Sequence, residues 1–291
     1  MNNYAWLIKR EFWENRAIWV IPSIIGIVML LGVLFGRIQF MNLDTPQQSH
    51  VVGQMVLSAF GATFFVVMSI YSTWYLLDCL YGDRKDRSVL FWKSLPISDT
   101  TTVLSKLLVA LIVIPLVYFV AADITTLLAA FILSVRSSGA LGGAMWHGDL
   151  WLQLQILWLY VIVTTAIWFL PVAGWLMVIS AWAKRAVMLW SILPPLALYL
   201  GEHLFMRTHF IATQLADRLM GYGPRAFHTG ADSNFWMTTT FDNDQITTPS
   251  SLWALLNPAG FFSSPQTWIG AAVGAALVVA AIQLRLRRTE I

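Results

Sequence analysis

Residues 105–135, SKLLVALIVIPLVYFVAADITTLLAAFILSV, form the stretch that best predicts the fold class. The stretch carries only two formal charges, Lys106 near its start and Asp123 near its middle. As a helix it is long enough to cross the hydrocarbon core of a bilayer, which is about 30 Å thick. Its apolar residues are continuous, whereas a strand of a membrane β-barrel alternates apolar and polar side chains. The stretch therefore predicts a transmembrane helix.

The rest of the chain repeats this pattern. Hydrophobic residues make up 58% of the 291 and charged residues 11%, about half of the charged fraction that is typical of a soluble domain. Five further apolar runs are long enough to span a membrane: residues 17–36, 53–81, 151–183, 186–205 and 266–285. The sequence thus predicts an all-α polytopic membrane protein with six transmembrane helices, in a single transmembrane domain over residues 1–291 whose first five spans occupy 17–205.

The distribution of basic residues predicts the orientation of these spans. If the N-terminus lies inside, 13 of the 18 Lys and Arg residues fall in inner segments and five in outer segments, as the positive-inside rule requires. We therefore expect both termini on the cytoplasmic side. The first apolar run is too long for the core of a signal peptide, so we expect no cleavable leader. The net charge of +3 is modest and gives no indication of nucleic-acid binding.

A charged segment, DRKDRSVLFWKSLPISD at residues 83–99, separates the second and third apolar runs. Its centre, Val89–Trp92, is an apolar plug with basic residues around it, which is the composition of a docking knob. Pro96 is expected to end a short helix, and Ser98 or Asp99 to cap the third span. The segment predicts a surface helix that contacts a partner in the aqueous phase; an interfacial helix without a partner is the alternative.

The first sixteen residues predict an amphipathic helix on the inner leaflet. The apolar sector contains Tyr4, Ala5, Ile8 and Phe12, and Trp6 and Trp13 widen it. The opposite sector contains Arg10, Glu11 and Glu14, with Leu7 as an apolar exception. Lys9 and Arg16 flank the apolar sector, from which their long side chains can reach the headgroups. A solvated N-terminal arm is the alternative.

The longest segment expected outside the membrane is 206–265. It is polar around 217–244 and apolar again over 252–262, a stretch too short to span, which predicts a re-entrant or interfacial element before the last span at 266–285. Small-residue faces at Gly32-x-x-x-Gly36 and Gly270-x-x-x-Gly274 predict close helix packing, either within the chain or with a second copy.

Few residues offer chemistry. No lysine follows a glycine, so the chain has no phosphate-binding loop and is not expected to be an ATPase or any other enzyme. Asp123 is a functional-site hypothesis because a carboxylate at that depth is costly, and with Thr125 and Thr126 it could line a substrate path or carry a proton. A structural role beside a wet cavity is the alternative. Only Glu202, His203, His209 and His228 hint at a metal, and their spacing is poor, so no metal site is expected.

The order of these elements resembles that of the membrane subunit of type-2 ABC exporters. Two segments carry the resemblance, residues 4–16 and residues 78–106. In that family the first corresponds to a connecting or elbow helix, here with Ile8, Lys9, Arg10, Glu11, Phe12 and Trp13. The second contains the coupling helix, here with Ser88, Val89, Leu90, Phe91, Trp92, Lys93, Ser94, Leu95 and Pro96.

The resemblance implies a permease subunit in the bacterial inner membrane, which exports an amphiphilic or hydrophobic substrate. It implies as partners two copies of a soluble ATPase subunit, which bind the ATP and magnesium, and a second permease copy or a paralogue, all in contact with membrane lipid. A proton-coupled secondary transporter that uses Asp123 is the alternative function. The motifs do not identify the substrate.

Overall fold

The computed structural model describes residues 3–36, 46–85, 98–136, 146, 148–228, 240–242, 245–247 and 252–287. The longer helices are α1 (Asn3–Glu14), α2 (Ala17–Phe35), α3 (Pro46–Lys85), α5 (Asp99–Leu108), α6 (Ile114–Arg136), α8 (Gly148–Trp168), α9 (Leu170–Trp182), α10 (Val187–Gly201), α11 (Phe210–Met220) and α14 (Pro265–Arg287). The shorter elements are η1 (Val109–Val113), η2 (Glu202–Met206), α12 (Tyr222–Ala226), η3 (Leu252–Leu255), α13 (Pro258–Ser263) and the paired strands β1 (Thr240–Asp242) and β2 (Gln245–Thr247).

Six helical segments in the described residues are long and apolar enough to cross a membrane. They are Ala17–Phe35, Met55–Lys85, Asp99–Arg136, Gly148–Trp168, Val187–Phe205 and Pro265–Arg287. The third of these is continuous from α5 through the π-helical turn η1 into α6, with Pro115 just after the π turn. A proline lacks an N–H, and such a turn absorbs the resulting gap in the backbone hydrogen bonds. This number agrees with the sequence-based prediction and is consistent with a multi-pass membrane protein.

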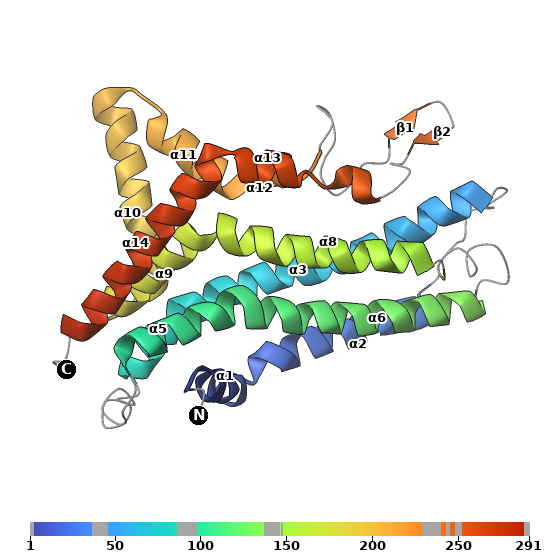
Figure 1. Ribbon diagram of the computed structural model, residues 1–291, viewed down its shortest axis with the longest axis horizontal. Coiled ribbons are helices and arrows are strands. Elements are labelled where there is room, and N and C mark those ends of the chain that lie inside the picture. Colours follow the sequence, from blue (N-terminus) through green and yellow to red (C-terminus); the bar gives the residue numbers. More distant parts are fainter. Residues whose placement is uncertain are drawn as a thin grey trace.

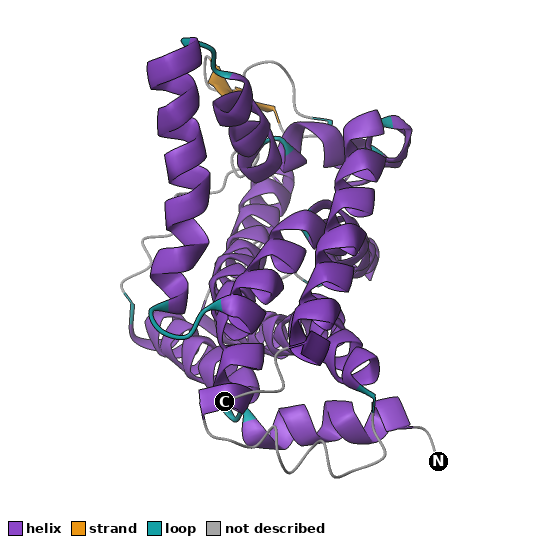
Figure 2. Cartoon of the chain, turned by 90° about the vertical axis from the view of Figure 1, so that its left-hand side faces the viewer, coloured by secondary structure: helices purple, strands orange, loops and turns teal. Residues whose placement is uncertain are grey.

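The helices α2, α3, α6 and α8 run along the long axis of the molecule (Figure 1). Helix α6 packs against α2 and α3, and α9 packs against α3 and α14. The N- and C-termini lie near the same end of the bundle in Figure 1, as expected for a chain whose two ends share one side of a membrane. Helix α1 lies at one edge of the bundle near that end and runs across the long axis: it is viewed along its axis in Figure 1 and from the side in Figure 2.

The predicted fourth span, 151–183, is two helices rather than one. Helix α8 ends at Trp168, and α9 begins at Leu170, with Pro171 in its first turn. Phe169 between them has φ −87° and ψ 3°, outside the helical range. Pro171 has no N–H to donate to the carbonyl of Ile167, and its ring would clash with that carbonyl in a continuous helix, so the chain turns at this point. Continuous hydropathy conceals the bend because both helices are apolar.

The Gly270-x-x-x-Gly274 face packs within the chain: Gly274 packs against α9, and Gly270 packs against the Arg218 side chain of α11. A Cβ atom at Gly174 would lie 2.8 Å from the carbonyl oxygen of Gly274, and one at Gly274 would lie 2.7 Å from the backbone of Leu170. Only glycine permits this approach of two backbones. A Cβ atom at Gly32 would meet nothing within 4 Å, so the first small-residue face packs differently.

The apolar stretch 252–262 forms η3 and α13, which pack along α8. Trp168, Tyr222, Phe227 and Phe261 are buried together there, and the backbone N–H of Asn257 donates to the carbonyl of Ala226 at 3.0 Å. The predicted element therefore exists as two short helices that pack on the bundle. Its re-entrant path in a membrane stays a prediction.

Candidate functional site

The predicted coupling residues Ser88–Pro96 lie outside the described residues, but the residues on both sides are described. Helix α3 continues to Lys85, and α5 begins at Asp99. Ser98 caps α5, because its Oγ accepts a hydrogen bond from the N–H of Thr101 at 3.1 Å. The predicted cap is thus confirmed, and the third span begins earlier than the expected residue 105.

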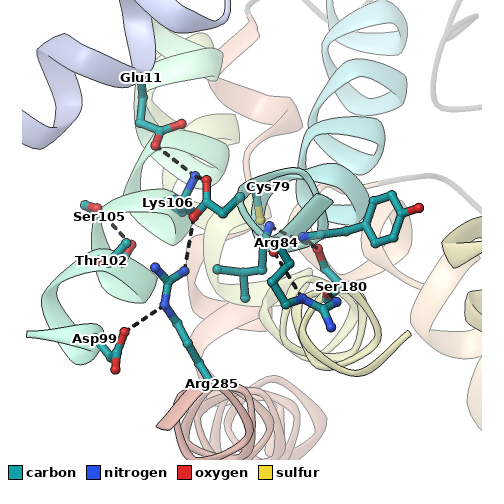
Figure 3. A network of polar contacts seen from close by, with 12 residues as sticks. Glu11, Cys79, Arg84, Asp99, Thr102, Ser105, Lys106, Ser180 and Arg285 are labelled. Atoms are coloured by element: carbon teal, nitrogen blue, oxygen red, sulfur yellow. Dashed lines mark hydrogen bonds and ion pairs between the residues drawn. The ribbon is translucent and has the colours of Figure 1, made fainter. Parts of the chain in front are cut away.

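One arginine joins the two flanks of this segment. Arg285 of α14 places its Nη1 3.1 Å from Oδ2 of Asp83, at the end of α3, and its Nε 2.9 Å from Oδ1 of Asp99, at the start of α5 (Figure 3). The side chain of Arg285 is 9% exposed. The segment between α3 and α5 therefore begins near Asp83 and ends near Asp99, and the Arg285 guanidinium contacts both of these carboxylates.

Lys106 extends the ion pairs to the N-terminal helix. Its ammonium lies 3.2 Å from Oδ1 of Asp83 and 2.9 Å from Oε1 of Glu11 (Figure 3). The side chains of Lys106 and Glu11 are 3% and 1% exposed. We call Glu11, Asp83, Asp99, Lys106 and Arg285 the ionic network; it joins α1, α3, α5 and α14.

The burial of Glu11 corrects the predicted orientation of α1. The sequence placed Glu11 on a face turned to water, with Arg10 and Glu14 beside it. Instead, Glu11 and Leu7, one turn earlier, are both buried and face the bundle. Glu11 also accepts hydrogen bonds from the Tyr75 hydroxyl at 2.8 Å and from Arg10 at 2.6 Å. The sequence did contain a sign of this burial. Leu7 is an apolar side chain within the polar sector of α1, which indicates that this sector contacts the protein and not water.

Charge balance makes this burial tolerable. Burial by itself raises the pKa of the Glu11 carboxyl, but attraction to Lys106 and hydrogen bonds from Lys106 and Arg10 outweigh it, so the pKa lies below its ordinary value. Positive and negative groups alternate through the network, and every carboxylate in it contacts a cation. Such a network is costly to break, because removal of one member takes a partner from each buried charge that it contacts.

Helix α9 holds the same end of α3 from another side. The Ser180 Oγ accepts hydrogen bonds from the N–H groups of Leu80 and Tyr81, at 3.1 and 3.0 Å. Arg84 donates to the carbonyl of Ala183 at 2.9 Å and to that of Ser180 (Figure 3). The last turns of α3 before the undescribed segment thus contact α1, α5, α9 and α14.

Asp123 has a partner that the sequence did not reveal. Its Oδ1 accepts a hydrogen bond from Nε2 of Gln155, on α8, at 2.9 Å. Thr125 and Thr126 do not join this pair: each donates its hydroxyl to a backbone carbonyl one turn earlier, and both are buried. Thr125 instead packs against Gly26 of α2. The predicted trio is therefore separated, and Asp123 with Gln155 is the polar pair of this region.

Glu202 has a structural role at the C-terminal end of α10. Its carboxylate accepts hydrogen bonds from the Thr208 hydroxyl and from the N–H of Ile211, each at 2.6 Å, and so caps α11. The rings of His203 and His209 lie 5.3 Å apart. Within the described ranges, no three His, Cys, Asp or Glu side chains are grouped to hold a metal ion.

Comparison of the chain with models of protein families, with curated proteins and with solved structures gave no match.

Proposed function

We propose that this chain is the membrane permease subunit of an ATP-driven type-2 ABC exporter. The observation that carries the proposal is the double contact of Arg285 with Asp83 and Asp99, on either side of the predicted coupling segment. A surface segment on which a partner pushes must be attached firmly at both ends, because slack at its ends would absorb the movement. The ionic network supplies that attachment.

The network also determines which helices a push on the segment displaces. Because α1, α5 and α14 are each paired with a charge at the end of α3 or beside it, they move with α3 as one body. The segments Met55–Lys85 and Asp99–Arg136 are long, so displacement of their ends is passed along the bundle. A partner's ATP cycle at Ser88–Pro96 would in this way open a path for the substrate.

The chain's lack of a phosphate-binding loop assigns ATP and magnesium to a soluble partner, present in two copies, and export requires a second permease copy or a paralogue. The substrate is amphiphilic or hydrophobic, because the spans carry few charges between their ends. The corresponding location is a bacterial inner membrane with both termini in the cytoplasm.

The proposal predicts that an adjacent reading frame encodes a soluble P-loop ATPase, and co-expression of the chain with that ATPase tests the proposal. The wild-type chain should retain the ATPase during purification, and replacement of Ser88–Pro96 by a Gly-Ser linker of equal length should abolish retention. The same replacement at residues 231–239, in the outer segment, is the matched control and should retain the ATPase. A linker variant at Ser88–Pro96 that retains it as well as the wild type would contradict the proposal.

The contact between Asp123 and Gln155 favours a second candidate, a proton-coupled secondary transporter. A carboxylate within a span, held by a neutral amide, has the chemistry of a proton carrier. This candidate predicts transport that depends on a pH gradient, requires no ATPase and is lost in Asp123→Asn. Transport that persists in Asp123→Asn but depends on ATP would exclude it.

A further inference from the structure

Helix α1 is held close to the membrane surface by a short connection. It ends at Glu14, and the first span begins at Ala17, so only Asn15 and Arg16 separate them. Two residues extend the chain by about 7 Å at most. Because α1 lies at the edge of the bundle and runs across its long axis, its whole length runs along this surface (Figures 1 and 2).

The ionic network fixes the rotation of α1 about its own axis. Glu11 and Leu7 face the bundle and are almost completely buried. Lys9 lies two residues from Glu11, which in an α-helix places it on the opposite side. The side of α1 that faces away from the protein therefore contains Lys9, with Trp6 and Trp13 on either side of it along the helix.

These three residues form an ordered surface, which we call the Trp–Lys–Trp face. Trp6 and Trp13 are 56% and 66% exposed. The Lys9 ammonium lies 5.3 Å from the ring centroid of Trp6 and 4.9 Å from that of Trp13, within the range of cation–π attraction. Both rings thus hold the cation in place before any ligand arrives.

The charges around α1 leave this cation uncompensated. Glu11 is paired with Lys106, and Glu14 lies 3.3 Å from Arg10. In the part of the chain that the structure describes, no carboxylate lies within ion-pair distance of Lys9. Arg16, in the connection to α2, is also exposed. The Trp–Lys–Trp face therefore complements a negatively charged ligand.

We propose that the Trp–Lys–Trp face binds the headgroup of an anionic phospholipid in the leaflet next to α1. The Lys9 ammonium would contact the phosphate, and the indoles would occupy the headgroup layer that tryptophan prefers. The helix that follows, α2, also exposes apolar side chains, among them Trp19, Ile24 and Ile27, as expected of a helix in contact with lipid. The proposal requires only a membrane protein and does not depend on the proposed ATPase partner.

Thermal unfolding of the full-length chain in detergent tests the proposal, with phosphatidylglycerol, phosphatidylcholine or inorganic phosphate added. Phosphatidylglycerol should raise the Tm of the wild type more than phosphatidylcholine does, and phosphate alone should not. Lys9→Gln should weaken the apparent affinity for phosphatidylglycerol about fivefold, which corresponds to one basic contact with an anionic surface. Lys9→Arg should preserve the affinity.

Lys184→Gln is the matched control, since Lys184 is an exposed lysine between α9 and α10; it should bind phosphatidylglycerol as the wild type does. Three results would overturn the proposal. They are an unchanged lipid preference in Lys9→Gln, an equal effect of inorganic phosphate, and a loss of ATPase retention in Lys9→Gln while its lipid preference persists. The last result would assign the face to a protein partner.

Discussion

The two ends of helix α14 are each held by an arginine, but with different partners. Arg285, at its C-terminal end, contacts the carboxylates of Asp83 and Asp99. At the other end Arg218, from α11, lies 4.3 Å from the ring centroid of Trp168 and donates to the carbonyls of Trp168 and Gln266, at 3.1 and 2.9 Å. One end is held by full charges, and the other by an aromatic ring and backbone dipoles.

This difference has a physical consequence for each end. A carboxylate in the ionic network that loses its cation is left charged and buried, which costs more than the lost attraction. A carbonyl or an indole that loses Arg218 is left neutral, and water can replace the lost hydrogen bonds where the site is open. The end beside the predicted coupling segment should therefore respond more strongly to changes of charge.

The largest effect is expected for Lys106→Met. Glu11 and Asp83 would both lose a buried partner, and the free energy of unfolding should fall by about 3–5 kcal/mol. Thermal unfolding in detergent, followed by tryptophan fluorescence, measures this loss. Lys184→Met, which removes an exposed lysine, should leave the Tm unchanged. A double variant Glu11→Gln, Lys106→Met should recover part of the stability, because it also removes one of the two buried carboxylates that lost Lys106.

A smaller loss is expected for Gly174→Ala, in α9, where this helix crosses the middle of α14. The free energy of unfolding should fall by about 1–3 kcal/mol. The new methyl group would lie 2.8 Å from the Gly274 carbonyl and 2.9 Å from Leu277 Cβ, so α9 and α14 must separate. Gly32→Ala is the control, because nothing lies within 4 Å of that position. Equal unfolding temperatures for both variants would argue against the close approach.

Arg218→Ala should lower the free energy of unfolding by about 1–2 kcal/mol, less than Lys106→Met does. It removes a cation–π contact and two hydrogen bonds to carbonyls but leaves no buried charge behind. Comparing the two variants by thermal unfolding at one pH tests the central difference between the ends. A larger fall in the free energy of unfolding for Arg218→Ala than for Lys106→Met would contradict the proposed difference between the two ends of α14.

Acid should weaken the network end selectively. The pKa of Glu11 is lower in the folded chain than its ordinary value of 4.5, so its stabilising contribution is complete above that value and is lost as the pH falls through the folded pKa. Stability measured between pH 7 and pH 5 should therefore change little on account of Glu11, and fall below about pH 4.5. In Glu11→Gln this acid-dependent part should be absent, whereas Arg218→Ala should retain it.

The smallest effect on stability is expected for Asp123→Asn, below about 1 kcal/mol, because the new amide oxygen can still accept the hydrogen bond from Gln155. Thermal unfolding measures this difference, with Gln155→Leu as the variant that removes the donor and leaves the carboxylate unpaired. A loss in Asp123→Asn as large as that in Lys106→Met would mean that Asp123 is part of a charge network of its own.

Hydropathy predicted the six spans because a bilayer requires apolar length, whatever the tertiary contacts. It did not predict the bend at Phe169, since two apolar helices in sequence have the same composition as one. Local chemistry predicted the Ser98 cap, which involves only neighbouring residues. The predicted helix at Ser88–Pro96 lies outside the described residues and stays a prediction.

The ionic network could not be predicted from the sequence, for a different reason. The helical period shows which residues of α1 share a face, but it does not show whether that face meets water, lipid or another helix. Glu11 and Lys106 are 95 positions apart in the chain, and no local pattern joins them. A lysine inside an apolar run was the signal that a carboxylate must lie nearby. The same limit concealed Gln155 as the partner of Asp123.

The order in which the ribosome makes this chain gives the Arg285 contacts another meaning. Glu11, Asp83, Asp99 and Lys106 are all synthesised and inserted long before Arg285 emerges. Until then the growing chain holds three carboxylates of the network against one lysine. Insertion of α14 thus adds the second cation of the network to a site formed much earlier. A chain whose translation stops before residue 285 would lack the guanidinium that joins Asp83 to Asp99, so the two ends of the predicted coupling segment would be tied together only after the last helix is in place.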